Sequence, residues 1–401
     1  MNLTRLKLLS ACGSALVFLP GPLHGAGKQS DSKDPISYYG GPGELQAVVV
    51  GEVPLVYTTQ LLPLGLDGEV LKPGDIKAQA EQVLDTLAVV LEPAKSALSR
   101  TVKLNICVAH ADLIQQVNAV FLTRFPGSNQ PAATIVVTTL PKAEALVAMD
   151  AVAVAEESPS GVTFMKKPAL ERDICAAAVL PAGPKIYVSG MADTNALPEG
   201  TRKTLEKLMS VLGHFGLQKT DVVQLKAFLE PMAKAELVRQ EVTTFFGELT
   251  PPLVLVEWRS PAPNPPIEIE VIAAAKGDFS KETETVSFLT PPGTTSTKVF
   301  SRVARVNHGK LIYMSGFYGK VTATRNIFSA IRQISLACGS DLEHLVKATY
   351  YVSSEEASKA LNDIRPEFFN PKRPPAASKA MVRAVGISET TVLVDMIAVT
   401  K

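Results

Sequence analysis

Hydrophobic and polar positions in the last quarter of the chain follow two periods, which predicts an ordered series of strands and helices. Short, nearly continuous apolar runs are typical of buried strands, and apolar residues recurring every three or four positions are typical of helices. The predicted elements are strand 310–317, helix 324–338, strand 344–352, helix 354–369, strand 375–382 and strand 392–399. A series of this kind is typical of one small α+β domain.

The same series is predicted twice more upstream, which indicates three copies of one domain. Tyr187 to Gly190 repeats the pattern of Tyr313 to Gly316, and Tyr57 to Gln60 holds the same place in a weaker form. The predicted copies span residues 44–156 (copy 1), 165–276 (copy 2) and 299–401 (copy 3), with a linker at 277–298. Because this period is too long for a solenoid unit, each copy is expected to bury its own core.

Each copy is predicted to fold as β-β-α-β-α-β-β, a sheet covered on one face by two helices. In copy 1, Val48–Val50 and Pro54–Tyr57 suit a pair of neighbouring strands. The uncovered face of each sheet must be buried elsewhere. Three such faces can turn inward around a pseudo-threefold axis, so that a monomer acts as an intramolecular trimer. The alternative is three separate domains on a string, and the short linkers favour the compact arrangement.

The N-terminus predicts export. Arg5 and Lys7 supply positive charge before the apolar run Leu8–Leu19, and a region of small residues and turns follows. This pattern indicates a signal peptide at 1–27, followed by a polar linker at 28–43, and therefore a periplasmic or secreted protein. The apolar run is too short for a membrane-spanning helix, so no membrane span is expected.

The composition limits the kinds of partner that the chain is expected to bind. Apolar residues make up 46% of the chain and charged residues 20%, as in a folded soluble protein. Forty basic and 39 acidic residues leave a net charge of +1 without long blocks of one sign, so no nucleic-acid partner is expected. The four cysteines form no Cys-x-x-Cys pair and the histidines show no ligand spacing, which favours packing thiols over a metal or redox site. No cofactor is predicted.

These motifs together resemble the reactive-intermediate deaminase family, also called RidA or YjgF. The resemblance rests on Ser-Gly at the end of the second strand, a Val-Lys-x-Thr strand, a helix with Asn and Phe, a Pro-Ala strand and a closing acidic strand. Copy 3 carries all of them, at Ser315-Gly316, Val346–Thr349, Asn362 with Phe369, Pro375-Ala376 and Asp395. The resemblance implies chorismate-mutase-like α+β domains in a trimer, with small-molecule ligands bound between neighbouring copies.

The resemblance also implies a chemistry, the hydrolysis of enamines and imines such as 2-aminoacrylate to a keto acid and ammonia. In the family an arginine directly after Pro-Ala clamps the substrate carboxylate, and the closing-strand acid with backbone groups near Ser-Gly handles the attacking water. In this chain Ala133, Leu253 and Ala377 stand at the arginine position. A bidentate fork is hard to replace. We therefore expect no acceleration of 2-aminoacrylate hydrolysis.

Seven residues are the candidates for the site. Asp150, Glu270 and Asp395 are candidate catalytic acids, because a carboxylate on an apolar strand can activate water, or they are structural acids bonded at the trimer axis. The candidate substrate-binding residues are Lys379, Ser315, Gly316 and Asn362. Lys379 follows Ala377 by two residues and therefore lies on the same strand face. Its alternative role is that of a solvated surface lysine.

Two functions remain open from the sequence. The first is an imine or enamine deaminase, a hydrolase of altered specificity that lacks the clamp arginine. The second is a non-catalytic pseudotrimer that binds a small metabolite between its copies or is purely structural. Copy 3 combines the most motif residues, so any pocket is expected where the Pro375 strand meets another copy.

Overall fold

The computed structural model describes residues 34–40, 46–166, 174–260, 264–386 and 389–401. The predicted signal peptide, 1–27, lies outside these residues, as does part of the predicted linker 28–43. None of the described helices is long and apolar enough to cross a membrane.

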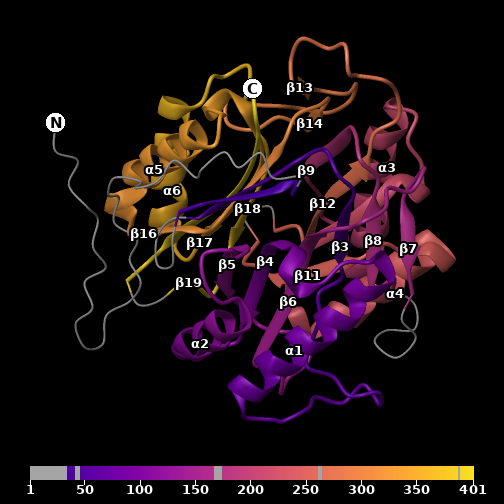
Figure 1. The fold of residues 1–401 in the computed structure, drawn as a ribbon, viewed down its shortest axis with the longest axis vertical. Helices are drawn as coiled ribbons and strands as arrows, with labels where there is room; N and C mark the ends of the chain where they lie inside the picture. The colour runs from indigo at the N-terminus through magenta and orange to yellow at the C-terminus, as the bar shows by residue number, and fades with distance from the viewer. Residues whose placement is uncertain (1–33, 41–45, 167–173, 261–263, 387–388) are drawn as a thin grey trace.

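Three sheets, each covered on its outer face by two helices, form the molecule (Figure 1). Copy 1 contributes β3 (Leu55–Thr58), α1 (Ile76–Leu91), β4 (Thr101–Val108), α2 (Ile114–Arg124), β5 (Ala132–Val137) and β6 (Val147–Val154). Copy 2 contributes β9 (Lys185–Asp193), α3 (Leu197–His214), β10 (Val222–Leu229), α4 (Ala235–Phe246), β11 (Leu253–Glu257) and β12 (Ile267–Ala274). Copy 3 contributes β15 (Leu311–Met314), β16 (Phe317–Gly319), α5 (Thr324–Ala337), β17 (Leu345–Val352), α6 (Glu355–Phe368), β18 (Ala376–Met381) and β20 (Val392–Val399).

A second set of strands links the sheets, because the two strands that precede the main sheet of each copy join the sheet of another copy. β7 (Thr163–Met165) and β8 (Ala177–Leu180) extend the sheet of copy 1. β13 (Val286–Leu289), inside the segment predicted as a linker, and β14 (Val303–Val306) extend that of copy 2. β1 (Ile36–Tyr39) and β2 (Ala47–Val50) extend that of copy 3, which closes the ring.

The predicted pairing of Val48–Val50 with Pro54–Tyr57 is therefore wrong. Val48 lies opposite Tyr313, and Tyr57 lies opposite Val152 and Ala178. An apolar strand pattern determines which residues are buried, but a uniformly apolar strand fits more than one partner. The four-residue connection from Gly51 to Pro54 carries the chain from one sheet to the next instead of reversing it.

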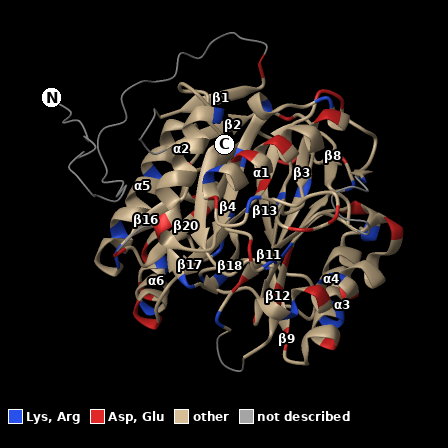
Figure 2. Ribbon diagram, turned by 90° about the horizontal axis from the view of Figure 1, so that it is seen from below, with Lys and Arg blue, Asp and Glu red and all other residues tan. Residues whose placement is uncertain are grey.

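The interior consists of one core beneath each helix pair and a shared core at the axis. The helix cores are centred on residues such as Leu84, Leu212 and Ile331, which are buried. The shared core contains Tyr57, Tyr187 and Tyr313, one from each copy, together with aliphatic residues of all three sheets. The predicted fold class, three α+β copies closed as an intramolecular pseudotrimer, is confirmed. Charged residues of both signs are interspersed over the outer helices and loops (Figure 2).

Candidate active site

The acids Asp150, Glu270 and Asp395 converge at the pseudo-threefold axis. Each lies at the middle of its closing strand, opposite an inward-facing residue of the neighbouring strand in the same copy. The opposed pairs are Asp150 with Asn105, Glu270 with Lys226 and Asp395 with Thr349. All three acids are buried. The structure thus brings together residues that stand far apart in the sequence.

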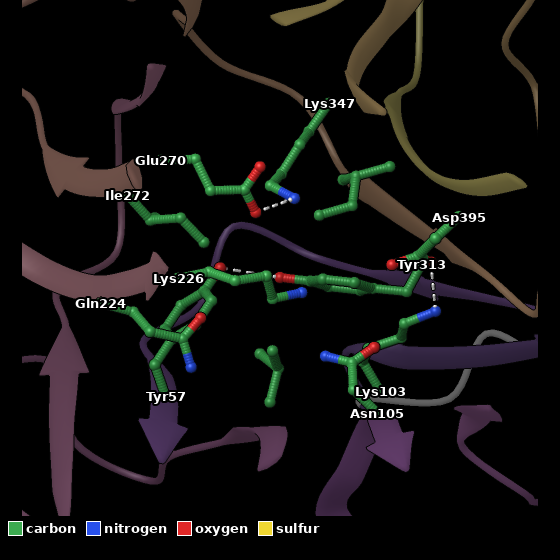
Figure 3. A pocket seen from close by; sticks show the side chains of 12 residues that line it. Tyr57, Lys103, Asn105, Gln224, Lys226, Glu270, Ile272, Tyr313, Lys347 and Asp395 are labelled. Carbon is green, nitrogen blue, oxygen red and sulfur yellow. Dashed lines mark hydrogen bonds and ion pairs between the residues drawn. The ribbon is translucent and has the colours of Figure 1, made fainter. Parts of the chain in front are cut away.

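Two of these acids form ion pairs across the boundaries between copies. Lys103 Nζ of copy 1 lies 2.6 Å from Asp395 Oδ1 of copy 3, and Lys347 Nζ of copy 3 lies 2.7 Å from Glu270 Oε1 of copy 2 (Figure 3). Burial raises the pKa of Asp395, but Lys103 and its neighbouring lysines outweigh that effect and leave its pKa below the usual value. A carboxylate held by a buried lysine is a poor base, so this geometry favours the structural role.

Asp150 differs from the other two acids. Asn105 Nδ2 donates to Asp150 Oδ2 at 2.8 Å, and no lysine among the described residues lies within ion-pair distance of this carboxyl. Burial raises its pKa above the ordinary value, although the charge of Lys226 and the Asn105 hydrogen bond act in the opposite direction.

Ser315 and Gly316 lie at a different place, the junction of copies 3 and 1. Gly316 N donates to Ala133 O at 2.9 Å, and Ala133 N donates to Ser315 Oγ at 3.3 Å. The Tyr318 hydroxyl accepts from Ile135 N at 2.7 Å and donates to Ile135 O at 3.1 Å. The Ser-Gly turn is therefore hydrogen-bonded directly to the strand on which the family clamp would stand.

The junction of copies 1 and 2 is closed in a similar way. Gln60 N and Thr59 Oγ1 both donate to Leu253 O, at 3.0 and 2.9 Å. Gln60 Nε2 also donates to Leu255 O at 3.0 Å. Leu253 occupies the clamp position of copy 2, so at this junction too the main chain is satisfied by protein groups.

The junction of copies 2 and 3 carries ionisable groups instead. Gly190 N donates to Ser378 Oγ at 3.1 Å, and Arg302 Nη1 donates to Gly190 O at 2.7 Å and to Ser189 Oγ at 3.1 Å. Glu268 packs directly over Gly190, because a Cβ placed on Gly190 would lie 2.0 Å from Glu268 Oε1. Only glycine leaves room for this carboxyl.

Glu268 has the electrostatics of a general base. Burial, followed by the neighbouring charge of Glu270, raises its pKa from 4.5 to about 7, while a hydrogen bond with Ser378 and the charges of Arg302 and Lys379 act in the opposite direction. A carboxyl with a pKa near the working pH can both accept and return a proton. At this junction the Glu268 carboxyl, the Arg302 guanidinium and the hydroxyls of Ser189 and Ser378 come together from copies 2 and 3.

Lys379 and Asn362 are brought together on the outer face, beneath α6. Lys379 Nζ donates to Ser358 Oγ at 2.8 Å and to Asn362 Oδ1 at 3.2 Å, and Asn362 Oδ1 also accepts from Arg365 Nη2 at 2.6 Å. The structure does not bring Lys379 to Gly316, because β18 packs against β9 of copy 2 while Gly316 contacts copy 1.

Sequence reasoning missed Glu268, Arg302 and Ser378. A signal for Glu268 was present, because it precedes Glu270 by two residues and alternate residues of a strand share a face. Arg302 and Ser378 carry no comparable signal, since they reach Gly190 from another copy. Among the described residues no group of three or more His, Cys, Asp or Glu could hold a metal ion, and Cys107, Cys175 and Cys338 are free and buried.

Three α+β copies closed around one axis, with their junctions bridged by hydrogen bonds, define a single-chain trimer of small domains. The chain belongs to the Endoribonuclease L-PSP family, which matches residues 45–155, 176–275 and 295–400. This confirms the predicted RidA/YjgF membership and the triple copy.

The chain is similar to single-copy proteins of the same kind. A RutC family protein of Pyrococcus abyssi is 30% identical over 112 residues, 28% of this chain and 85% of the relative. A Rid family protein of unknown function from Yersinia pestis is 29% identical over 27% of this chain and 85% of that one, with a TM-score of 0.24. A YjgF family member from Neisseria meningitidis is 21% identical over 29% and 95%, with a TM-score of 0.22.

Proposed function

We propose that the chain is a hydrolase of small neutral imines with a single working site, at the junction of copies 2 and 3. The observation that supports it most is the Glu268 carboxyl, with a pKa of about 7, placed over Gly190 beside Ser378. The reaction class comes from the family resemblance. The site comes from the junction at which, among the described residues, a carboxyl and a guanidinium lie against the Ser-Gly turn.

The proposed reaction needs one group that moves protons in both directions. Water adds to the imine carbon and the carbon–nitrogen bond breaks, so that both water protons finish on the nitrogen as the carbonyl compound and ammonia form. Glu268 would carry each proton from the oxygen to the nitrogen. A base with a pKa near neutrality suits both halves of this transfer.

The preference for a neutral substrate follows from the cations. Arg302 Nη1 is already directed at Ser189 and Gly190, and Lys379 is bonded to Ser358 and Asn362 on the opposite face. Arg302 Nη1 and Lys379 Nζ are thus already bonded to protein acceptors, and the family clamp position is Ala or Leu in every copy.

The test is ammonia release from a neutral imine that an amine oxidase generates in the same cuvette. We expect acceleration by the wild-type chain, loss on Glu268→Gln, and retention on Ser315→Ala, because Ser315 lies at the closed junction of copies 3 and 1. Equal loss in both variants, or activity in Glu268→Gln, would refute the assignment of the site.

The direct hydrogen bonds at two of the three junctions favour a second candidate, the non-catalytic pseudotrimer. It predicts that the wild-type chain accelerates the hydrolysis of none of the imines tested.

Export is a separate proposal that rests on Arg5, Lys7 and the apolar run Leu8–Leu19. Cell fractionation, with the mass of the mature N-terminus, tests it; full-length chain in the cytoplasm would contradict it.

A further inference from the structure

A small polar chamber lies at the pseudo-threefold axis, apart from the junction of copies 2 and 3. Its volume is about 30 Å³. It is lined by Tyr57, Lys103, Asn105, Val152, Gln224, Lys226, Glu270, Ile272, Tyr313, Lys347, Asp395 and Ile397. Tyrosine and aliphatic side chains of all three copies pack on one side, and a second apolar cluster that includes Phe228 and Tyr351 packs on the other. The chamber is thus a charged layer between two apolar layers.

The three lysines of the chamber differ in how many of their ammonium protons are hydrogen-bonded. Lys103 Nζ donates to Asp395 Oδ1, Thr134 Oγ1 and Met314 O, which accounts for its three protons. Lys347 Nζ contacts Glu270 Oε1 and Thr349 Oγ1. Lys226, at 7% exposure, forms no hydrogen bond or ion pair with any residue that the structure describes.

The charges of Asp150, Glu270 and Asp395 stabilise the Lys226 ammonium, but its protons have no hydrogen-bond acceptor among the described residues, so they are suited to a partner inside the chamber. Figure 3 shows its nitrogen directed into the space between Glu270, Tyr313 and Asn105. Asn105 Oδ1 is likewise buried and has no partner among the described residues. The donors of Lys226 Nζ point to an acceptor bound in the chamber, whereas Asn105 Oδ1 is itself an acceptor and is suited to a donor such as water.

The charges of the chamber decide which species fits. Lys103, Lys226 and Lys347 balance the lining carboxylates Glu270 and Asp395 together with Asp150, which is hydrogen-bonded to Asn105 of the lining, when all are ionised. Of the acids, Asp150 alone has no lysine within ion-pair distance among the described residues, so it is the first to take up a proton. The groups that face it are Lys103, Asn105, Cys107, Lys226 and Asp395. Its protonation leaves one excess positive charge around Lys226.

We propose that the axial chamber binds one small monovalent anion of about the size of chloride, held by Lys226, with binding coupled to the protonation of Asp150. The volume sets the size limit. A water molecule needs roughly 10–15 Å³ by this measure, so the chamber has room for one or two water-sized particles and not for a large organic anion such as gluconate. Burial supports the proton coupling, because it raises the pKa of Asp150.

The first experiment is thermal unfolding of the full chain in chloride and in gluconate at equal ionic strength. An anion that binds only the folded state raises the melting temperature with the logarithm of its concentration. We expect this rise with chloride at acidic pH, a smaller rise at alkaline pH, and none in Lys226→Met. Lys281→Met, a change at an exposed lysine, should respond as the wild type does. Equal melting temperatures in chloride and gluconate at both pH values would overturn the proposal.

The second experiment removes any dependence on how well Lys226→Met folds. Crystals of the wild-type chain grown at acidic pH with sodium bromide are measured at the bromine absorption edge. We expect an anomalous peak at hydrogen-bond distance from Lys226 Nζ. A chamber that contains only water, with no anomalous peak, would overturn the proposal as well.

Discussion

The hydroxyl oxygens of Tyr57 and Tyr313 lie 3.0 Å apart although 256 residues separate them in the chain. The two residues belong to copies 1 and 3, and both are buried at the axis with Tyr187 of copy 2. The strands β1 and β2, near the start of the described chain, complete the sheet of copy 3, so the ring closes through the first and last parts of the chain. Because one chain carries three copies of different sequence, the three junctions between them can differ.

Replacing Lys347 by methionine should destabilise the chain strongly. The change leaves Glu270 as an unpaired carboxylate in the interior, and breaking a buried pair in this way costs about 3–5 kcal/mol. Urea unfolding measures the difference. The matched control is Lys359→Met, because Lys359 pairs with Asp363 on the exposed face of α6 and should contribute little. Equal effects of the two substitutions would contradict a buried ionic axis.

Gly190→Ala should abolish the proposed activity and lower stability. The added Cβ would lie 2.0 Å from Glu268 Oε1, so the carboxyl must move. The control is Gly213→Ala in α3, where an added Cβ meets nothing within 4 Å. That substitution should stabilise the helix by about 0.5–1 kcal/mol. Full activity in Gly190→Ala would show that the position of Glu268 is not important.

Glu268→Gln should stabilise the chain at alkaline pH and leave its stability unchanged in acid. The folded-state pKa of Glu268 is about 7, above its ordinary 4.5, so this carboxyl destabilises the fold progressively as pH rises from 4.5 to about 7. Glutamine cannot ionise, and the gain at about pH 8 should be about 1–3 kcal/mol. Urea titrations at several pH values give the difference, and a gain independent of pH would contradict the raised pKa.

The wild-type chain should not accelerate the hydrolysis of 2-aminoacrylate. Ala133, Leu253 and Ala377 stand where a clamp arginine is needed, and Arg302 is engaged by Ser189 and Gly190. A dehydratase that produces 2-aminoacrylate, coupled to an ammonia assay, provides the measurement. Acceleration above the uncatalysed rate would show that Arg302 or another cation can replace the clamp.

The sequence was sufficient to predict the triple copy and the axial fold, because element order and the three acids recur at matching places. It could not assign the acids a role, since the lysine that pairs with Asp395 is Lys103, 292 residues away. To predict whether Lys379 and Gly316 share a pocket, one must know which neighbouring copy each of them faces. That is decided by the cyclic order of the sheets, in which β18 faces β9. Strand partners were equally undetermined, because apolar strands such as β2 fit several neighbours.

The pH dependence of neutral imine hydrolysis tests the central claim most directly. The measured quantity is the ratio of the rate with the chain to the rate without it, which divides out the pH dependence of the uncatalysed reaction. If Glu268 is the base, this ratio rises with pH through about 7, following the pKa of its carboxyl, and the rise is absent in Glu268→Gln. The same profile in wild type and Glu268→Gln, or a ratio of one at every pH, would contradict the account.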